Sequence, residues 1–323
     1  MQSNIHNGDH LIGTPQWGES KNWFYQNLVF HYRVIGNESS PPIVLIHGFG
    51  ASSDHWRNNA EVFAANGFRI YGIDLIGFGK SEQNLQGKSI YLNNQFWSNQ
   101  LVSFLDEIVD IKKNGKVILI GNSLGALIAI TALSQRPELI KTIIAAPLPE
   151  PTFINPIKPI FPNSLKKVKS FLIKIFFHLV PLKLLVNLIS RTRLINFALQ
   201  SAYFRSISKD KLLKRIVTVP ARRPNAHKAL RSMCIGMSNR SKAEKGPSII
   251  AKIQNLHNRP PILLIWGDQD KLIPIFLAKK LIKLHPWLKL TVINDAGHCL
   301  HDELPKHFNQ IVLKWLENLK TSK

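Results

Sequence analysis

Cysteine is scarce in this chain of 323 residues, which contains only two, Cys234 and Cys299. Two cysteines cannot build a disulfide scaffold, so the fold must depend on an apolar core, and the 45% hydrophobic composition is sufficient for one. No run approaches the roughly 18–20 uninterrupted apolar residues that a membrane-spanning helix needs. Residues 1–21 are polar and lack the apolar stretch of a secretory signal. We therefore expect a cytoplasmic protein, either free or peripheral on a membrane.

Acidic residues are almost missing from the middle of the chain. Between Pro151 and Pro260 there are 22 Lys and Arg but only two acids, Asp210 and Glu244, which gives a net charge of +20. The remainder carries 20 basic and 18 acidic residues, so nearly all of the overall charge of +22 belongs to this one segment. A general bias of composition would spread the basic residues evenly. The segment therefore needs an explanation of its own.

Nucleotide-binding and metal-binding patterns are also missing from the sequence. There is no GxGxxG or Walker pattern, and the histidines do not stand at a spacing typical of zinc ligands. We therefore predict no cofactor and no metal. The basic segment does not fit nucleic acid either, because it lacks stacking aromatic residues interleaved with glycine.

Short apolar runs alternate with helical patterns on either side of the basic segment, and each run is typical of a buried strand. These runs are Ile43–Ile46, Arg69–Leu75, Lys116–Gly121, Lys141–Ala146, Pro261–Trp266 and Lys289–Ile293. The rhythm predicts an α/β fold with a doubly wound, mostly parallel sheet and helices on both faces. Alternating aromatic and polar residues over Trp23–Val34 predict a hairpin before it.

Four parts follow from this pattern. Residues 1–22 are a polar extension, 23–147 the first part of the core, 148–259 a basic helical cap, and 260–323 the second part of the core. The cap is predicted to be helical because no buried-strand run appears between Leu148 and Arg259. We expect it to lie over the carboxyl edge of the sheet.

A serine stands between a predicted strand and a predicted helix, in the run Gly121-Asn122-Ser123-Leu124-Gly125. In this context the G-x-S-x-G pattern places the serine on a sharp turn with its hydroxyl exposed, and the two glycines relieve crowding. The N-terminus of the following helix supplies amide donors for developing negative charge. Ser123 is therefore the candidate nucleophile.

A serine nucleophile needs a base, and the base needs an acid to hold it. Both follow predicted strands in the expected chain order: Asp268 and Asp270 come after one strand, and His298 comes after the next. His298 is preferred to His301 because Gly297 lets its loop approach the serine. The choice between the two aspartates is open on this argument alone.

The motifs His47-Gly48, Gly121–Gly125, Gly267–Asp270 and Gly297-His298 resemble those of α/β hydrolases, over all of the chain except the insertion. The resemblance implies the α/β-hydrolase fold and a Ser123–Asp270–His298 triad, with Asp270 as the acid in a G-x-x-D pattern. It also implies an oxyanion hole made by the backbone amides of Phe49 and Leu124.

The serine also limits the chemistry. Haloalkane dehalogenases and epoxide hydrolases resemble this scaffold but need an aspartate nucleophile, so they are excluded. Lipases, thioesterases, C–C hydrolases and cofactor-free peroxidases stay open, and a carboxylic ester is the expected substrate. A protein that binds or tethers membranes without catalysis is the alternative from another class, although it would normally have lost part of the triad.

The basic segment is strongly apolar as well as basic. Between Leu165 and Leu199 it contains seven Lys and Arg, no acid, and many large apolar residues. Such a segment suits an anionic membrane surface, and it also suits a lid over an active site. We expect Trp56, Phe176 and Phe177 to contact the substrate.

The runs His47–Gly50, Tyr71–Ser81 and Gly121–Gly125 are similar to those of the branch that contains chlorophyll dephytylases and pheophytinases. A second glycine often follows the elbow in that branch, and Ala126 stands here instead. The similarity implies a bulky apolar ester, a lipid or the phytyl ester of a tetrapyrrole, and a place in chlorophyll degradation.

Overall fold

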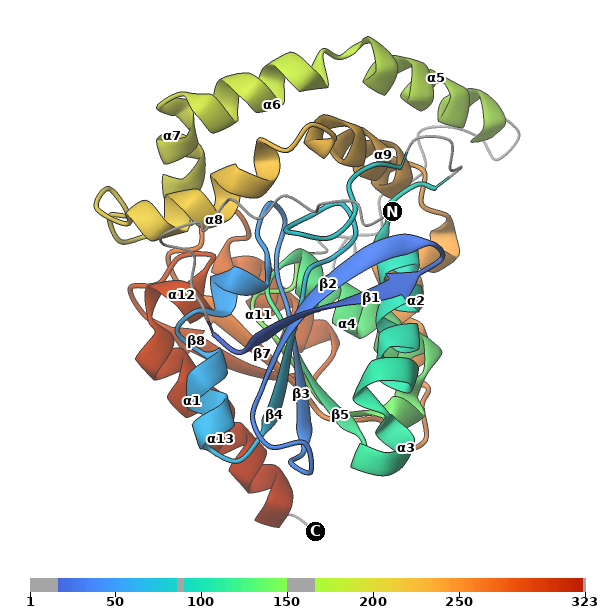
Figure 1. Ribbon diagram of the computed structural model, residues 1–323. Coiled ribbons are helices and arrows are strands. Elements are labelled where there is room, and N and C mark those ends of the chain that lie inside the picture. The colour runs from blue at the N-terminus through green and yellow to red at the C-terminus, as the bar shows by residue number, and fades with distance from the viewer. Residues whose placement is uncertain (1–16, 86–89, 150–165, 322–323) are drawn as a thin grey trace, which may run out of the picture.

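The computed structural model describes residues 17–85, 90–149 and 166–321, and its centre is one eight-stranded sheet in the order β1-β2-β4-β3-β5-β6-β7-β8 (Figure 1). The strands are β1 (Glu19–Tyr25), β2 (Leu28–Ile35), β3 (Pro42–Ile46), β4 (Arg69–Ile73), β5 (Val117–Gly121), β6 (Ile140–Ala145), β7 (Ile262–Gly267) and β8 (Lys289–Ile293). β2 pairs antiparallel with β1 and with β4, and the other neighbours pair in parallel. The predicted α/β fold with a mostly parallel sheet is confirmed.

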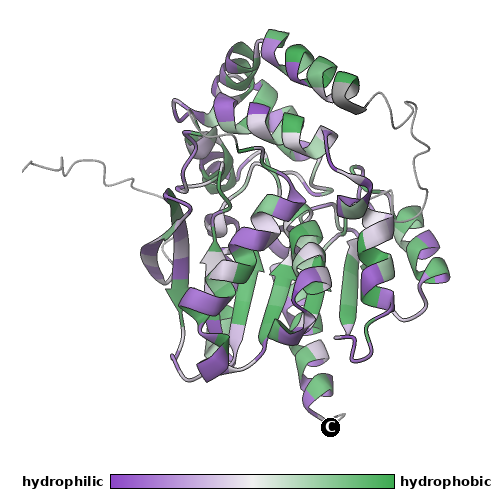
Figure 2. Ribbon diagram, turned by 90° about the vertical axis from the view of Figure 1, so that its right-hand side faces the viewer, coloured by the Kyte–Doolittle hydropathy of each residue, from purple (hydrophilic) through white to green (hydrophobic). Residues whose placement is uncertain are grey.

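The central strands are apolar along their whole length because helices cover both faces of the sheet. Every residue of β3, β5 and β7 is buried, and the strands are uniformly hydrophobic in Figure 2. One face packs against α2 (Asn94–Phe104), α4 (Leu124–Gln135) and α11 (Ile275–Leu284). The other packs against α1 (Ala60–Ala65), α12 (Leu300–Glu303) and α13 (Pro305–Thr321). Burial on both faces is what makes such strands read as continuous apolar runs.

The hairpin at the edge of the sheet is closed by a two-residue turn. Gln26 and Asn27 have φ values of 50° and 59°, as a type I′ turn requires, and this turn matches the twist of the strands it joins. The sheet begins earlier than predicted, because Trp17 is 2% exposed and packs against Gly72 of β4. Trp17 therefore belongs to the core and residues 19–22 to β1, although the sequence assigned both to a polar extension. Residues 1–16 lie outside the described chain.

Between β6 and β7 the described chain is helical. Its helices are α5 (Lys166–Leu179), α6 (Leu182–Arg191), α7 (Leu194–Gln200), α8 (Lys211–Ala221), α9 (Ala226–Ser238) and α10 (Gly246–Gln254). α5 to α9 form a layer beyond the end of the sheet, with α5 and α6 outermost (Figure 1). α10 differs, because it packs on α4, and Ile249, Ile250 and Ile253 belong to the core cluster of the sheet. The predicted boundary at residue 259 is therefore not a packing boundary, and we use "cap" below for α5–α9.

Candidate active site

Ser123 occupies a strained turn between β5 and α4. Its φ and ψ are 51° and −114°, a conformation that costs energy for a residue with a side chain. A Cβ added at Gly121 would collide with the backbone of Gly125, and one added at Gly125 would collide with the Ile46 carbonyl. The two glycines of the G-x-S-x-G pattern thus permit the turn that holds the Ser123 side chain out.

Asp270 and His298 meet on the loops that follow β7 and β8. Asp270 Oδ2 lies 2.9 Å from His298 Nδ1, and its Oδ1 accepts hydrogen bonds from the amides of Leu272 (2.9 Å) and Ile273 (2.8 Å). Both side chains of the pair are buried. Asp268 makes no hydrogen bond to His298 within the described chain. The geometry thus favours Asp270 over Asp268 as the partner of the imidazole.

Ser123 and His298 line one cavity of about 430 Å³. They form no hydrogen bond with each other among the described residues. Such contacts are often loose in a protein without substrate and tighten when it binds. The cavity is in the size range of a small-molecule site. Its walls come from both regions of the chain: Phe49, Phe78 and Leu272 from loops at the sheet edge, and Val186, Ile189, Ile195, Leu199, Leu213, Val217 and Leu230 from the cap.

Two backbone amides near Ser123 have no partner in the described residues: that of Phe49, which lines this cavity, and that of Leu124, the next residue in the chain. Leu124 is the first residue of α4, where helical amides have no intrahelical acceptor. The Phe49 loop comes close to the elbow because Gly48 has no side chain: a Cβ there would lie 3.3 Å from Ser123 Cβ. Both amides are thus available as donors near Ser123, which is the arrangement that an oxyanion hole requires.

Asn122 ties the elbow to the other loops. Its side-chain amide donates to the carbonyl of Ala146 at 2.7 Å and to the carbonyl of His298 at 3.3 Å. The motif analysis assigned no role to this position, because the G-x-S-x-G pattern leaves it open. The structure shows a direct link between the Ser123 turn and the His298 loop.

The His298 loop is also held by the cap. The carbonyl of Ala202 accepts hydrogen bonds from the amides of His298 (2.9 Å) and Cys299 (3.2 Å). Gly297 lies against the backbone of Phe204, and its own amide donates to Glu303 Oε2 at 2.6 Å. The segment after α7 therefore fixes the backbone on which the imidazole stands.

A buried polar cluster joins the same segment to the core. The Tyr203 hydroxyl donates to Asp302 Oδ2 at 2.9 Å and lies 2.8 Å from His55 Nε2. Burial lowers the pKa of His55 to about 4, so the ring is neutral and its Nε2–H donates to the tyrosine oxygen. Arg57 binds Asp302 of α12 and Asp210, the residue before α8. This cluster could not be predicted from a sequence pattern, because its members are far apart in the chain.

Cys299 is a second nucleophilic side chain at the cavity. Its thiol is buried next to His298, and burial, followed by the charge of Asp302, raises the pKa of the Cys299 thiol far above its usual range. A protonated thiol is a weak nucleophile. Of the two side chains, Ser123 is therefore the better candidate nucleophile.

Three residues expected to contact the substrate lie elsewhere. Trp56 is 0% exposed and packs in the core beside His301 and Phe308, whereas its neighbour His55 on the same short 3₁₀ helix lines the cavity. Phe176 is 60% exposed, and it contacts Phe177 on α5 at 5.1 Å between ring centres. Neither phenylalanine lines the cavity. α5 lies in the outermost layer of the cap, and the cavity walls come from α6 to α9 instead.

In the part of the chain that the structure describes, no group of three His, Cys, Asp or Glu side chains is placed to hold a metal ion. An apolar cavity, a serine on a strained turn, and a buried Asp–His pair form an arrangement suited to acyl transfer.

Comparison with known proteins agrees with this architecture. Residues 41–177 match the family described as "alpha/beta hydrolase fold". The AB hydrolase superfamily protein YfhM of Bacillus subtilis is 25% identical over 90% of this chain and 95% of its own length. The chloroplastic pheophytinase of Arabidopsis thaliana is 24% identical over 91% of this chain and 65% of its own length, and human epoxide hydrolase 4 is 22% identical over 96% and 80%.

A solved structure shows the same fold. An alpha/beta hydrolase fold protein from Burkholderia ambifaria superposes with a TM-score of 0.66 at 19% identity, over 91% of this chain and 97% of that one. The sheet order, the elbow between β5 and α4, the family match and these relatives agree with one another. The chain therefore has the α/β-hydrolase fold, and its residues 41–177 match the family model described by that fold.

Proposed function

We propose that this α/β hydrolase cleaves carboxylic esters through an acyl-enzyme on Ser123. The observation that carries the proposal is the buried Asp270–His298 hydrogen bond beside a serine on a strained turn, with both His298 and Ser123 facing one cavity. Asp270 is held by two backbone amides, so it is fixed as an acceptor for His298 Nδ1. Nε2 of the same ring is then the basic nitrogen left for Ser123.

The reaction has two halves. In the first, Ser123 Oγ attacks the ester carbonyl carbon while His298 Nε2 takes its proton, and the oxyanion accepts hydrogen bonds from the Phe49 and Leu124 amides. The tetrahedral adduct then expels the alcohol, which takes the proton from His298 and leaves an acyl group on Ser123. In the second half a water loses its proton to His298 and attacks the acyl carbon, and the carboxylic acid leaves as Ser123 regains its proton.

The substrate we infer is a bulky apolar ester, a lipid or the phytyl ester of a tetrapyrrole. The cavity walls support this choice, because the cap contributes mainly aliphatic side chains from α6, α7 and α8. Each methylene buried there adds about 0.8 kcal/mol of binding. Binding energy from a distant apolar tail can seat the ester at Ser123. The similarity to a pheophytinase points to the same class of ester.

One experiment tests both parts of the proposal. Purified protein is labelled with a fluorophosphonate probe, and kcat/KM is measured for pheophytin and for p-nitrophenyl butyrate in the same detergent. We expect probe labelling, hydrolysis of both esters, and a higher kcat/KM for pheophytin. The Ser123→Ala variant should lose labelling and at least about 10⁴-fold of turnover, while its thermal unfolding midpoint stays close to that of the wild type.

The control is Ser134→Ala, because Ser134 is on the helix that follows the elbow but its hydroxyl donates to the Thr131 carbonyl and does not line the cavity. It should keep labelling and turnover. Turnover that survives in Ser123→Ala would refute the acyl-enzyme, and a protein that takes no probe would instead be a non-catalytic member of the fold. A clear preference for butyrate would refute the bulky ester and leave the serine mechanism intact.

A further inference from the structure

The outer surface of the cap exposes an unusual number of large apolar side chains. Among the described residues, eleven of the twenty large hydrophobic side chains that are exposed lie within residues 168–197. They are Val168, Phe171, Leu172, Ile175, Phe176, Leu179, Leu184, Leu185, Leu188, Leu194 and Phe197. Single exposed apolar residues are ordinary, but a contiguous group marks an interaction site. We call this group the apolar ridge.

The apolar ridge follows from the helical repeat. On α5 the exposed residues stand at positions 171, 172, 175, 176 and 179, a spacing that places them along one side of a helix. α6 is apolar on two sides: Val186 and Ile189 line the cavity near Ser123, while Leu184 and Leu188 are exposed. The cavity accounts for the apolar character of Val186 and Ile189. Leu184 and Leu188 are not covered by other residues of the described chain.

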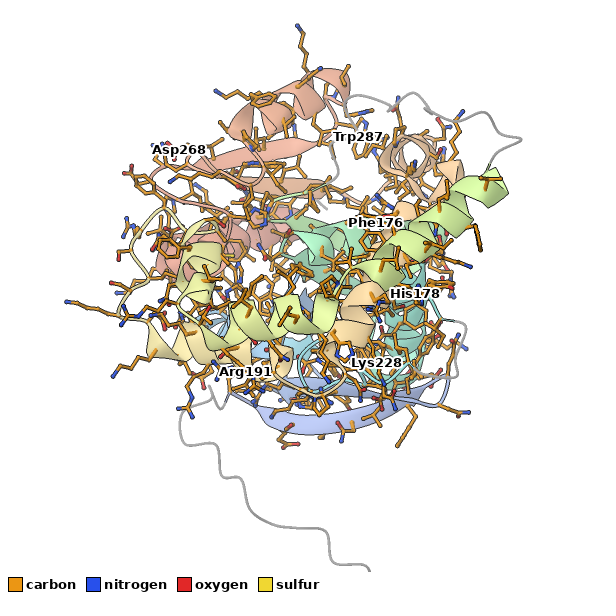
Figure 3. The ribbon with its side chains drawn as sticks, turned by 90° about the horizontal axis from the view of Figure 1, so that it is seen from above. Phe176, His178, Arg191, Lys228, Asp268 and Trp287 are labelled. Atoms are coloured by element: carbon orange, nitrogen blue, oxygen red, sulfur yellow. The ribbon has the colours of Figure 1, made fainter. Side chains whose placement is uncertain are left out.

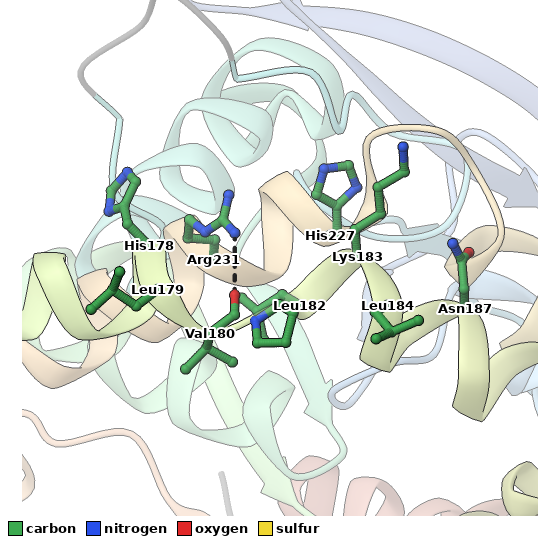
Figure 4. Close-up of a pocket in the computed structure, with 10 residues that line it drawn as sticks. His178, Leu179, Val180, Leu182, Lys183, Leu184, Asn187, His227 and Arg231 are labelled. Carbon is green, nitrogen blue, oxygen red and sulfur yellow. Dashed lines mark hydrogen bonds between the residues drawn. The ribbon is translucent and has the colours of Figure 1, made fainter.

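Basic groups flank the apolar ridge at the corner where α5 turns into α6. A surface pocket of about 430 Å³ opens there, lined among others by His178, Lys183, His227 and Arg231. In Figure 4 these four side chains point to one side of the corner, and Leu179 and Leu184 point to the other. Arg231 also fixes the corner, because it donates to the Phe177 carbonyl at 2.9 Å.

The field at this corner is positive. Burial, and then the positive charges of Arg231 and Lys183, lower the pKa of His227. Two further exposed cations, Arg191 and Arg193, stand at the far end of α6. Figure 3, viewed from above, shows Arg191 at the far end of α6 and both His178 and Phe176 near the end of α5 that meets α6. The basic groups therefore stand at the α5–α6 corner and at the far end of α6.

We propose that the apolar ridge and its basic flank dock the protein on the surface of an anionic lipid bilayer. Leu179, Leu184 and Phe176 enter the boundary between head groups and acyl chains, and the exposed cations Lys183 and Arg191 meet the lipid phosphates. The docked state does not rest on ester hydrolysis. It does bring the cavity near the lipid, because α6 contributes both to the ridge and to the cavity wall.

Docking in the interface fits the helices better than spanning does. No single helix among the described residues is long and apolar enough to cross a bilayer, although Ser170–Leu179 and Leu182–Arg191 meet the length and composition test as a pair bent by 52°. Both members are packed on one side: α5 against α9, and α6 against α7, α8 and α9. A pair held on that side presents only its outer surface to lipid.

The charge of the cap also argues against a second copy of the chain as the occupant. A two-fold dimer places the same patch on both partners, so the basic flank of one copy would face that of the other. Among residues 166–259, only Asp210 and Glu244 could offset the basic side chains, and Asp210 is engaged by Arg57. Anionic lipid supplies the missing negative charge.

Binding to vesicles tests the proposal directly. The Ser123→Ala protein, which leaves lipid intact, is sedimented with vesicles of phosphatidylcholine alone or with about 30% phosphatidylglycerol. We expect at least about tenfold tighter binding to the anionic vesicles, and a loss of that preference when salt is raised to about 0.5 M. Phe176→Ser with Leu184→Ser should weaken binding by about tenfold or more, because both side chains lose their burial in lipid.

The matched control is Phe276→Ser on α11, because Phe276 is 61% exposed and lies outside the apolar ridge. It should bind vesicles as the parent does. Lys183→Glu with Arg191→Glu should weaken binding to anionic vesicles by about tenfold and leave binding to phosphatidylcholine unchanged. Thermal unfolding of each variant checks that the fold is retained.

Several results would overturn the proposal. Equal binding to both kinds of vesicle would remove the role of charge, and equal effects of the ridge and Phe276 variants would remove the role of the ridge. Self-association of the parent in light scattering that disappears in the ridge variant, without any vesicle binding, would assign the ridge to a second copy. Phe176→Ser with Leu184→Ser is also made in the protein that keeps Ser123, and its hydrolysis of p-nitrophenyl butyrate is measured. Intact hydrolysis together with lost vesicle binding shows that docking can fail while the catalytic proposal holds.

Discussion

The sheet and the cap use apolar side chains in opposite ways. β3, β5 and β7 are buried at every residue, because helices cover both faces of the sheet. On α6 only Leu182 and Ser190 are buried, and on α7 no residue is. The apolar residues of the sheet therefore stabilise the fold, whereas most of those on α5 to α7 are placed to meet something else. In our two proposals, the inner side of this layer meets a substrate in the cavity and the outer side meets lipid.

The two regions also divide the work at the site. The candidate nucleophile, base and acid all come from loops that follow β5, β7 and β8, and most of the cavity wall comes from the cap. Because the sheet loops carry the candidate catalytic residues and the cap shapes the cavity, we expect substitutions in the two regions to change different measured quantities. The three predictions below use this difference, from the largest expected effect to the smallest.

Substitution of the proposed acid, Asp270, tests the proposed chemistry without changing the cavity wall that the cap provides. Asp270→Asn should lower kcat on a soluble ester by roughly 10⁴-fold, because the amide cannot hold His298 in the tautomer and charge state that the reaction needs. Asp268→Asn is the matched control on the same loop and should cost less than about tenfold, since Asp268 makes no hydrogen bond to His298 in the described chain. Steady-state kinetics on the two variants decides between the residues. A larger loss in Asp268→Asn would move the acid to that position.

Burial separates the two regions in a measurement of stability. Ile43 of β3 is 0% exposed, and Leu184 of the apolar ridge is 68% exposed. Ile43→Ala should lower the free energy of unfolding by about 2–5 kcal/mol, because it removes buried methyl groups and leaves a cavity. Leu184→Ala should change it by less than about 0.5 kcal/mol. Urea unfolding measures both, and a large loss for Leu184→Ala would mean that the ridge is covered by the chain itself.

The difference in burial between the sheet and the cap also explains which features could be predicted from the sequence. The strands were predictable because burial on both faces leaves a continuous apolar run, as in Ile43–Ile46. The elbow was predictable because its glycines meet a local steric requirement that any such turn imposes. Both signals are local, so they survive in a one-dimensional pattern.

The cap gave no such signal. The apolar residues of α5 and α6 do not indicate which helix faces the cavity. Phe176 and Phe177 of α5 were therefore predicted to contact a substrate, whereas the structure lines the cavity with residues of α6. Trp56 was misplaced because its short 3₁₀ helix can direct an aromatic ring to either side. The cluster of Arg57, Tyr203 and Asp302 was missed because it joins residues up to 245 positions apart.

The contact between the two regions at Gly297 should give the smallest of the three effects. A Cβ at this position would lie 2.7 Å from the amide nitrogen of Phe204 and 3.0 Å from the carbonyl oxygen of Ala202. Both are backbone atoms and cannot rotate away, so in Gly297→Ala either the His298 loop or the segment after α7 must move. A displacement of about 1 Å at a catalytic group can cost 10²-fold, so we expect kcat/KM to fall by about 10–100-fold. Gly115→Ala is the control, because a Cβ there meets no atom within 4 Å although its φ is also unfavourable for alanine. It should lose some stability and keep kcat/KM. If Gly297→Ala also keeps kcat/KM, the cap does not position the His298 loop, and its contribution to the site is limited to the walls of the cavity.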